Sequence, residues 1–201
     1  GVTMTLFLDN AATSTLRPEA WDALVGALES ANANASGTHG PARAAKNALE
    51  EARERAAAML GVAPMQVVFT SGGTEADNLA VLGTATRDSS VASMAIVTSE
   101  IEHKAVSEAV EKARGWGHRV TLVGCDRNGV VAVDDVSAVV SAETGLVSIM
   151  AANNEVGTLQ PVGEIARAVR ETNSGAIVHT DAVQAFVGAE LRPVIGDVDM
   201  V

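Results

Sequence analysis

The feature that most constrains this chain is an alternation between short apolar segments and longer segments with helical periodicity. The apolar segments are rich in β-branched residues and span residues 92–98, 119–123, 146–151 and 176–180. Segments with apolar residues three or four positions apart separate them, at residues 103–114, 133–141 and 161–172. Strands that alternate with helices of this length form a mostly parallel sheet covered by helices on both faces. The sequence therefore predicts an α/β fold, in which ligands gather where the strands end at their carboxyl edge.

The N-terminal part predicts two helices ahead of this alternation. Residues 6–8 are predicted to be extended and residues 9–13 to form a turn. A first helix begins at Pro18, because proline suits a first helical turn. Apolar residues continue it at helical spacing: Trp21, Leu24, Val25 and Leu28. After a loop at residues 32–40 that contains His39, a second helix is predicted over residues 41–60, ending at Gly61. Its predicted buried face consists of Ala44, Ala48, Leu49, Ala52, Ala56 and Met59.

Residues 67–79 predict a strand, a tight turn and a helix in immediate succession. The first N–H groups of a helix have no intrahelical partners and carry the positive end of the macrodipole. Gly72 and Gly73 allow close approach of a ligand to the backbone. Ser71 and Thr74 add hydroxyl donors, so the turn is a candidate phosphate site. The alternative is that Ser71 or Thr74 only caps the helix. The turn is neither a Walker A loop nor a GxGxxG fingerprint.

Three further groups of polar residues follow predicted strands. His103 comes after the first of them, and a histidine there also suits a helix start or a packing position. The successive amides Asn153 and Asn154 either bind a ligand or form a cap or an Asx turn. Asp181 closes the last strand and Gln184 follows three residues later, although an aspartate also suits a helix start.

A phosphate site, an imidazole, an amide and a carboxylate at successive strand ends indicate a phosphorylated heteroaromatic cofactor. Pyridoxal phosphate fits each group: the turn at Gly73 and Thr74 takes the phosphate and His103 stacks on the ring. An amide donates to the ring oxygen, and Asp181 pairs with the protonated pyridine nitrogen. The last contact matters most, because a pyridinium is the electron sink for carbanion chemistry and an aspartate keeps it charged.

The composition narrows the classes of function. The 201 residues carry a formal net charge of −11, which argues against a nucleic-acid or anionic-membrane surface. Aromatic residues make up only 2% of a chain that is 47% hydrophobic, so the core is expected to be aliphatic and alanine-rich. A single cysteine, Cys125, excludes an internal disulfide framework and fits a reducing, cytoplasmic compartment. No membrane span, signal peptide or metal site is predicted.

Six motifs in register resemble cysteine desulfurases, within the class V aminotransferase group of fold-type I pyridoxal phosphate enzymes. The resemblance runs from about Leu6 to Val201, with an Asn-Asn-Glu-Val-Gly run similar to that of the housekeeping and nitrogen-fixation branch. One departure is Ala42, where the family usually has glycine. The motifs are Leu8-Asp9-Asn10-Ala11-Ala12-Thr13, the loop through Ser36 and His39, Thr70-Ser71-Gly72-Gly73-Thr74-Glu75, Glu102-His103-Lys104-Ala105-Val106, Asn153-Asn154-Glu155-Val156-Gly157-Thr158 and Asp181-Ala182-Val183-Gln184.

The resemblance implies a role for each candidate residue. Gly73 and Thr74 would bind the phosphate, and His103 would stack on the pyridine ring as a catalytic residue that also relays protons. Asn154 would contact the substrate and the ring hydroxyl. Asp181 would pair with the ring nitrogen, and Gln184 would donate to the ring oxygen. The implied fold is the fold-type I large domain, incomplete at its C-terminus, over residues 16–201. Residues 1–15 would belong to the small domain.

The resemblance also implies an activity for the complete enzyme. It would convert L-cysteine to L-alanine and pass the sulfur, as an enzyme persulfide, to an acceptor or scaffold protein for iron–sulfur clusters or thiolated tRNA. It would be a homodimer. The family's Schiff-base lysine and sulfur-accepting cysteine are expected beyond Val201, because Lys104 is not at the family's lysine position and Cys125 is interpreted as a structural or surface thiol.

Residues 197–201 look like the entry into another apolar strand, so the chain is interpreted as a truncated form that is inactive alone. The alternatives are another class V member, such as an aminotransferase or a selenocysteine lyase, and a non-catalytic fold fragment or interaction module.

Overall fold

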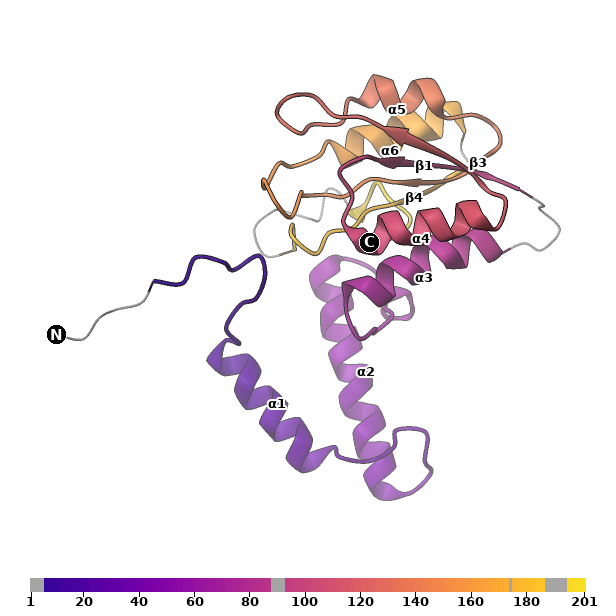
Figure 1. Ribbon diagram of the computed structural model, residues 1–201. Coiled ribbons are helices and arrows are strands. Elements are labelled where there is room, and N and C mark those ends of the chain that lie inside the picture. Colours follow the sequence, from indigo (N-terminus) through magenta and orange to yellow (C-terminus); the bar gives the residue numbers. More distant parts are fainter. Residues whose placement is uncertain (1–5, 88–92, 174, 187–194) are drawn as a thin grey trace. The chain divides into compact units, whose positions relative to one another are not determined.

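The computed structural model describes residues 6–87, 93–173, 175–186 and 195–201 (Figure 1). These residues fall into two compact units, Gly1–Val68 and Phe69–Val201. Residues 1–5 of the predicted N-terminal segment and the start of the strand predicted at residue 92 lie outside the described residues. The predicted division at residue 15 stays a prediction.

The first unit is helical, and the starts of its two longer helices and the end of the second agree with the sequence to within one residue. It contains α1 (Pro18–Ser30), α2 (Gly40–Leu60) and the short 3-10 helix η1 (Pro64–Gln66). Pro18 is the first residue of α1, as predicted. His39 caps α2, because its Nδ1 accepts a hydrogen bond from the Ala42 N–H at 3.3 Å. Gly61 ends α2 in the left-handed conformation, with φ of 76°, which glycine adopts without strain.

The predicted buried face of α2 is wrong. The residues that α2 buries are Ala42, Ala45 and Ala57, whereas Met59 is 54% exposed and Leu49 is 40% exposed. The helix is rich in alanine on all sides, so the spacing of its apolar residues does not single out one face. None of the apolar residues of α1 is buried either.

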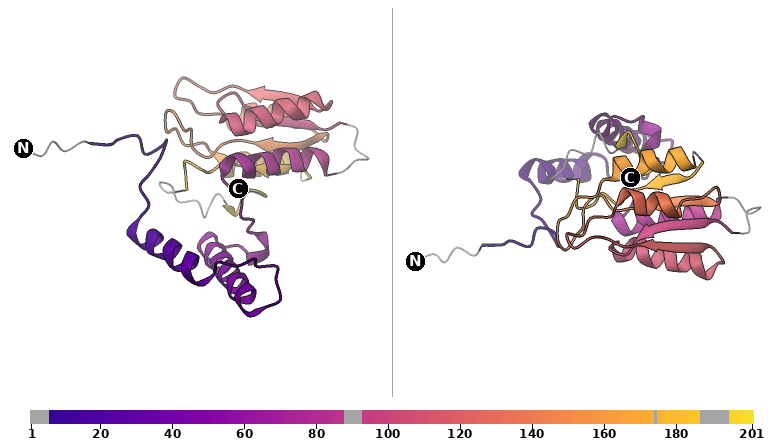
Figure 2. Two further views of the ribbon diagram at one scale, coloured as in Figure 1. Left: turned by 60° about the horizontal axis from the view of Figure 1, so that its bottom comes forward. Right: turned by 90° about the horizontal axis from the view of Figure 1, so that it is seen from above.

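The second unit has the predicted α/β architecture. Its elements are α3 (Gly73–Thr86), β1 (Ala95–Ser99), α4 (Lys104–Gly115), β2 (Arg119–Val123), α5 (Val133–Val139), β3 (Thr144–Ser148), α6 (Val162–Thr172) and β4 (Ile177–His179). The four strands pair in parallel in the order β2-β1-β3-β4. Figure 2 shows the strands side by side between layers of helices. The prediction of a mostly parallel sheet is confirmed.

Helices cover both faces of this sheet, as predicted. Alternate side chains of β1 enter different cores: Val97 packs with residues of α5 and α6, whereas Ile96 packs with residues of α3 and α4. In Figure 1, α5 and α6 lie on one side of the sheet and α3 and α4 on the other. Val147 and Leu146 of β3 divide in the same way. Strands buried on both faces read as nearly continuous apolar runs, which is why the sequence pattern is so clear here.

Three strand predictions need correction. Residues 67–69 do not form a strand: Val67 has extended dihedrals, φ −91° and ψ 123°, but Val68 and Phe69 are exposed and join no sheet. An apolar β-branched run favours extended backbone, yet a strand also requires a hydrogen-bonded neighbour. Strand β3 covers residues 144–148 rather than 146–151, because the last residue pair of its ladder with β4 joins Ser148 and His179. The predicted start of a strand at residues 197–201 reduces to one parallel bridge between Met200 and His179.

Candidate functional site

The sheet topology creates one preferred place for a ligand. From β1 the chain crosses to β2 on one side and then returns to β3 on the other side of β1. The loops after β1 and β3 therefore leave in opposite directions, and ligands bind at such a switch point. His103, Asn154 and Asp181 follow the carboxyl ends of β1, β3 and β4 respectively. The structure thus brings three of the sequence-predicted residues to one edge of the sheet.

The turn at the start of α3 presents uncapped N–H groups. No side chain caps this helix, so the alternative in which Ser71 or Thr74 is a simple cap is not borne out. The Ser71 hydroxyl instead donates to the Glu75 carboxylate at 2.6 Å, and the Ser71 N–H donates to the same oxygen at 2.7 Å. These bonds lower the pKa of Glu75. The first turn of α3 is therefore held by Glu75, while Gly73 and Thr74 are its first two residues.

Gly73 brings this turn against the loop that carries Asp181. A Cβ atom added at Gly73 would lie 2.7 Å from Cγ2 of Val183, so no larger residue fits without movement. The Val183 N–H in turn donates to Oδ1 of Asp181 at 2.9 Å. The Asp181 carbonyl accepts from the Ala151 N–H at 2.8 Å, which anchors the loop beside the end of β3. Gln184 is half-buried in the turn that follows.

His103 is the N-cap of α4. Its Nδ1 accepts a hydrogen bond from the Ala105 N–H at 3.2 Å. The helix-start interpretation is therefore correct for the backbone. The ring is nevertheless exposed, and the bond at Nδ1 fixes the tautomer with the proton on Nε2. A capping role and a ligand-facing role are compatible in this geometry.

The two asparagines after β3 have different tasks. Asn153 is buried, and its Oδ1 accepts from the N–H groups of Glu155 and Val156 at 2.9 and 3.0 Å. Its Nδ2 donates to the Ile101 carbonyl at 3.1 Å. Asn153 thus forms the Asx turn that the sequence left as an alternative. Asn154 makes none of these bonds and is half-buried.

A buried polar cluster of Asp77, Ser148 and His179 lies near Asp181, and sequence reasoning missed most of it. Nδ1 of His179 is 2.9 Å from the Ser148 hydroxyl, and its Nε2 is 3.7 Å from Oδ1 of Asp77 in α3. Burial lowers the pKa of His179 to about 4. Burial, and then the Asp181 carboxylate, raise the pKa of Asp77 to about 7. Between pH of about 4 and about 7, this contact therefore joins the protonated carboxyl group of Asp77 to the neutral imidazole of His179, rather than two charged groups. The helical spacing of Asp77 among apolar residues was the available signal.

Glu102 belongs to a motif that the sequence singled out, but sequence reasoning assigned this residue no role. Its Oε1 accepts from the Ser99 hydroxyl at 2.5 Å and from the Met150 N–H at 3.0 Å. Burial, with smaller contributions from the carboxylates of Asp181 and Asp77, raises the pKa of Glu102 to about 7 against the lowering effect of these two hydrogen bonds.

The carboxyl edge also concentrates unsatisfied polar atoms. Among the described residues, the buried side-chain oxygens without a hydrogen-bond partner are Thr98 Oγ1, Glu102 Oε2 and Thr180 Oγ1. Thr98 lies in β1, Glu102 follows β1, and Thr180 follows β4. Such atoms are rare in folded proteins and call for a reason. Their position supports this edge as the functional one.

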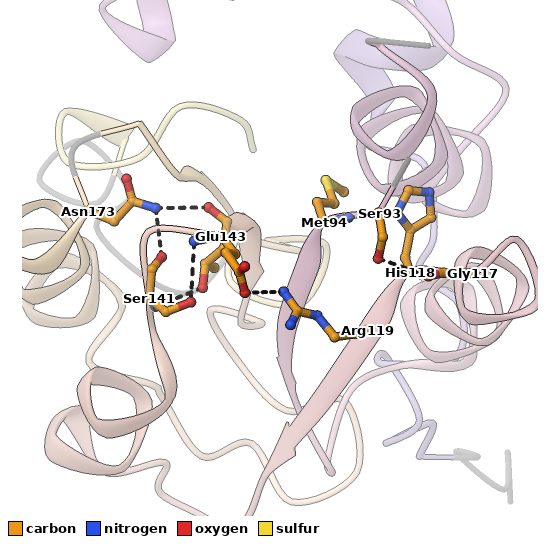
Figure 3. A network of polar contacts seen from close by, with 9 residues as sticks. Ser93, Met94, Gly117, His118, Arg119, Ser141, Glu143 and Asn173 are labelled. Carbon is orange, nitrogen blue, oxygen red and sulfur yellow. Dashed lines mark hydrogen bonds and ion pairs between the residues drawn. The ribbon is translucent and has the colours of Figure 1, made fainter. Parts of the chain in front are cut away.

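The opposite, amino edge of the sheet has a structural network instead. Asn173 Nδ2 donates to the carbonyls of Ser141 and Thr144, and Arg119 pairs with Glu143 (Figure 3). A cavity of about 390 Å³ lies here, lined in part by His118. The His118 Nδ1 accepts from the Met94 N–H at 3.2 Å. None of the predicted site residues lines this cavity, so we assign the functional site from the strand ends.

Two negative observations concern other classes of function. No helix in the described ranges is both long and apolar enough to cross a lipid bilayer. Within the same ranges, no cluster of three or more histidine, cysteine, aspartate and glutamate side chains is arranged to hold a metal ion.

Comparison with known proteins identifies the family. The sequence profile of class V aminotransferases matches residues 6–201. The chain belongs to the class V aminotransferase family. This confirms the resemblance at the level of the family.

Curated relatives of this chain are named as cysteine desulfurases, the activity that the sequence predicts. The cysteine desulfurase IscS of Dictyoglomus turgidum is 39% identical over 179 residues, which is 89% of this chain and 45% of that protein. A solved NifS-like protein superimposes with a TM-score of 0.88 at 36% identity, over 95% of this chain and 53% of its own. A structure of SspA in complex with cysteine superimposes with a TM-score of 0.87 at 31% identity, over 94% and 55%. The chain spans about half the length of the curated relatives it matches.

Proposed function

We propose that the complete protein is a pyridoxal phosphate-dependent cysteine desulfurase. It would take sulfur from L-cysteine as an enzyme persulfide, leave L-alanine, and pass the sulfur on for iron–sulfur cluster or thio-tRNA synthesis. The names of the relatives support the activity, and the cysteine complex of a structural neighbour supports the substrate. The observation that supports the proposal is the close approach of Gly73, at the uncapped start of α3, to Val183 in the loop that carries Asp181.

The residues at this edge fit pyridoxal phosphate. Backbone N–H groups at a helix start suit a phosphate, and Gly73 leaves space where a Cβ atom would not fit. A buried carboxylate such as that of Asp181 suits a protonated ring nitrogen. Thr74 would add to the phosphate contacts, Gln184 would donate to the ring oxygen, and Asn154 would contact the ring hydroxyl and the substrate. His103 would stack on the ring.

The chain's own residues would orient the reactants and hold protons. The cofactor, when bound, supplies a pyridinium ring that accepts electron density from a bond broken at the substrate's α-carbon. Asp181 would keep that ring nitrogen charged. The hydrogen bond at Nδ1 of His103 would hold the imidazole in one orientation, with its Nε2–H able to donate a hydrogen bond to a ligand.

We further propose that residues 1–201 do not complete the reaction alone. The three lysines are Lys46, Lys104 and Lys112, and none stands at the position of the family's cofactor-binding lysine. Residues 1–15 would belong to a small domain and residues 16–201 to the large domain. The complete enzyme would be a cytoplasmic homodimer that delivers sulfur to an acceptor or scaffold protein.

A cofactor titration tests the proposal. Pyridoxal phosphate is added to the purified chain, and binding is followed by the absorbance and circular dichroism of the cofactor. The wild-type chain is expected to bind, and Asp181→Asn is expected to bind roughly 30-fold more weakly, because a buried charge partner is lost. Asp135→Asn, at an exposed site in α5, serves as the control. Absence of binding by the wild-type chain, or equal binding by Asp181→Asn, would contradict the proposal.

A further inference from the structure

Two side chains cross between the loops at the switch point. Glu102, in the loop after β1, accepts the Met150 N–H from the loop after β3, and it also accepts the Ser99 hydroxyl at the end of its own strand. In the other direction, Nδ2 of Asn153 donates to the Ile101 carbonyl. The two loops are therefore joined by a reciprocal pair of hydrogen bonds, one from each side.

Each of these residues immediately precedes a predicted ligand-contacting residue. Glu102 precedes His103, which begins α4, and Asn153 precedes Asn154 in the Asx turn. A residue whose neighbour is anchored at its side chain has little freedom in its own backbone. The spacing between His103 and Asn154 thus depends on the contacts of Glu102 and Asn153.

We propose that Glu102 is a positioning residue, which holds the loop that carries His103 against the loop that carries Asn154. This inference rests on the proposed function only for the roles of His103 and Asn154, since the hydrogen bonds themselves involve no ligand. Asn153 supplies the second connection. A site that must hold a flat ring between an imidazole and an amide needs such a fixed separation.

The choice of a glutamate has an electrostatic consequence. One oxygen of Glu102 accepts two hydrogen bonds, and bonds to an ionised carboxylate are shorter and stronger than bonds to a neutral group. The titratable groups near it are Asp77 of α3 and Asp181 after β4, and both add to the effect of burial, so that together they raise the pKa of Glu102 to about 7. The connection between the loops therefore strengthens as the pH rises through about 7 and weakens below it.

Three variants separate this role from a general contribution to folding. Glu102→Ala removes the acceptor, Glu102→Gln keeps a neutral acceptor oxygen, and Glu100→Gln changes an exposed carboxylate of the same loop as the control. The measurements, made without cofactor, are the amide proton shift of Met150 against pH and the hydrogen-exchange rates of residues 150–157. Far-ultraviolet circular dichroism checks that each variant is folded.

In the wild-type chain and in Glu100→Gln, we expect the Met150 amide shift to titrate near pH 7. In Glu102→Gln, the titration disappears while exchange at pH 8 stays within about threefold of wild type. In Glu102→Ala, exchange of residues 150–157 at pH 8 rises roughly tenfold or more, the loss expected for a charge-assisted hydrogen bond. A titration that persists in Glu102→Gln, or unchanged exchange in folded Glu102→Ala, overturns the proposal.

The same variants then show whether the connection serves the site. If the chain binds pyridoxal phosphate, Glu102→Ala is expected to weaken binding about tenfold and Glu102→Gln much less. If wild type does not bind, the proposed function fails while the exchange results still decide the role of Glu102 as a connection between the loops. If wild type binds and Glu102→Ala binds equally, the positioning role is refuted and the proposed function stands.

Discussion

Asp77→Asn is predicted to change the stability of the protein in a pH-dependent way. Asp77 is 4% exposed, and burial and the nearby Asp181 carboxylate raise its pKa from 3.8 to about 7. The folded protein therefore holds this proton more tightly than the unfolded chain does. The favourable contribution is complete below pH 4 and is lost progressively as the pH rises to about 7, where the folded protein also releases the proton.

The magnitude follows from the two pKa values. Between pH 5 and pH 8, the free energy of unfolding of the wild-type protein is expected to fall by about 2 to 3 kcal/mol on account of Asp77. Asparagine has nearly the same shape as a protonated aspartate and does not ionise. We therefore expect a small effect of Asp77→Asn at pH 5 and a gain of about 2 kcal/mol over wild type at pH 8. His179 and Glu102 titrate in both proteins, so they largely cancel from the difference.

Urea unfolding at pH 5, 6, 7 and 8 measures this difference, with circular dichroism and tryptophan fluorescence as probes. Asp135→Asn, which alters an exposed carboxylate in α5, is the matched control and should shift stability equally at all four values. The reasoning is refuted if the difference between Asp77→Asn and wild type is the same at pH 5 and pH 8. It is also refuted if the variant loses stability relative to wild type as the pH rises.

Three further predictions concern the turns and the lysine. Gly73→Ala should weaken pyridoxal phosphate binding about tenfold, because its Cβ displaces Val183, whereas a Cβ at Gly72 meets nothing within 4 Å and Gly72→Ala should bind normally; equal binding by both variants in a cofactor titration would count against the close approach. Asn153→Ala should lower the free energy of unfolding by about 2 kcal/mol in urea, since it leaves three backbone groups without partners, while Asn154→Ala should change it by less than about 0.5 kcal/mol. Borohydride reduction of the chain with pyridoxal phosphate should leave Lys104 unlabelled in a peptide mass map, and a stoichiometric label there would contradict the proposal that no lysine in these residues attaches the cofactor.

The parts of the fold that could be predicted are those whose pattern depends on local periodicity. Helix α6 was predicted over residues 161–172 and observed at Val162–Thr172, with Ile165 and Val169 buried as expected. The strand at residues 119–123 was predicted with its observed bounds. The strand prediction for residues 67–69 was wrong because strand formation depends on a hydrogen-bonded neighbouring strand, which the local sequence does not encode. The prediction of the buried face of α2 was wrong because alanine occurs all around that helix.

For the candidate site too, local sequence patterns could be predicted and tertiary contacts could not. Residues at strand ends could be predicted, because parallel strands bring their carboxyl ends to one edge whatever the details of packing. The roles of Asp77 and Glu102 could not be predicted, because they depend on burial near Asp181, which is a property of tertiary packing. The roles that the sequence assigned to His103 and Asn154 remain predictions, whereas the backbone contacts beside them are visible only in three dimensions.

The Asp181 carboxylate also affects the two buried acids near it, Asp77 and Glu102. Its negative charge raises the pKa of both Asp77 and Glu102. Any positive charge that pairs with Asp181 weakens this repulsion and so lowers both pKa values. Binding of a cationic ring would therefore release protons from the two buried acids near neutral pH. A more fully ionised Glu102 in turn holds the Met150 N–H more strongly. Occupation of the Asp181 carboxylate and the hydrogen bond between the two loops would then favour one another, although Asp181 follows β4 and Glu102 follows β1.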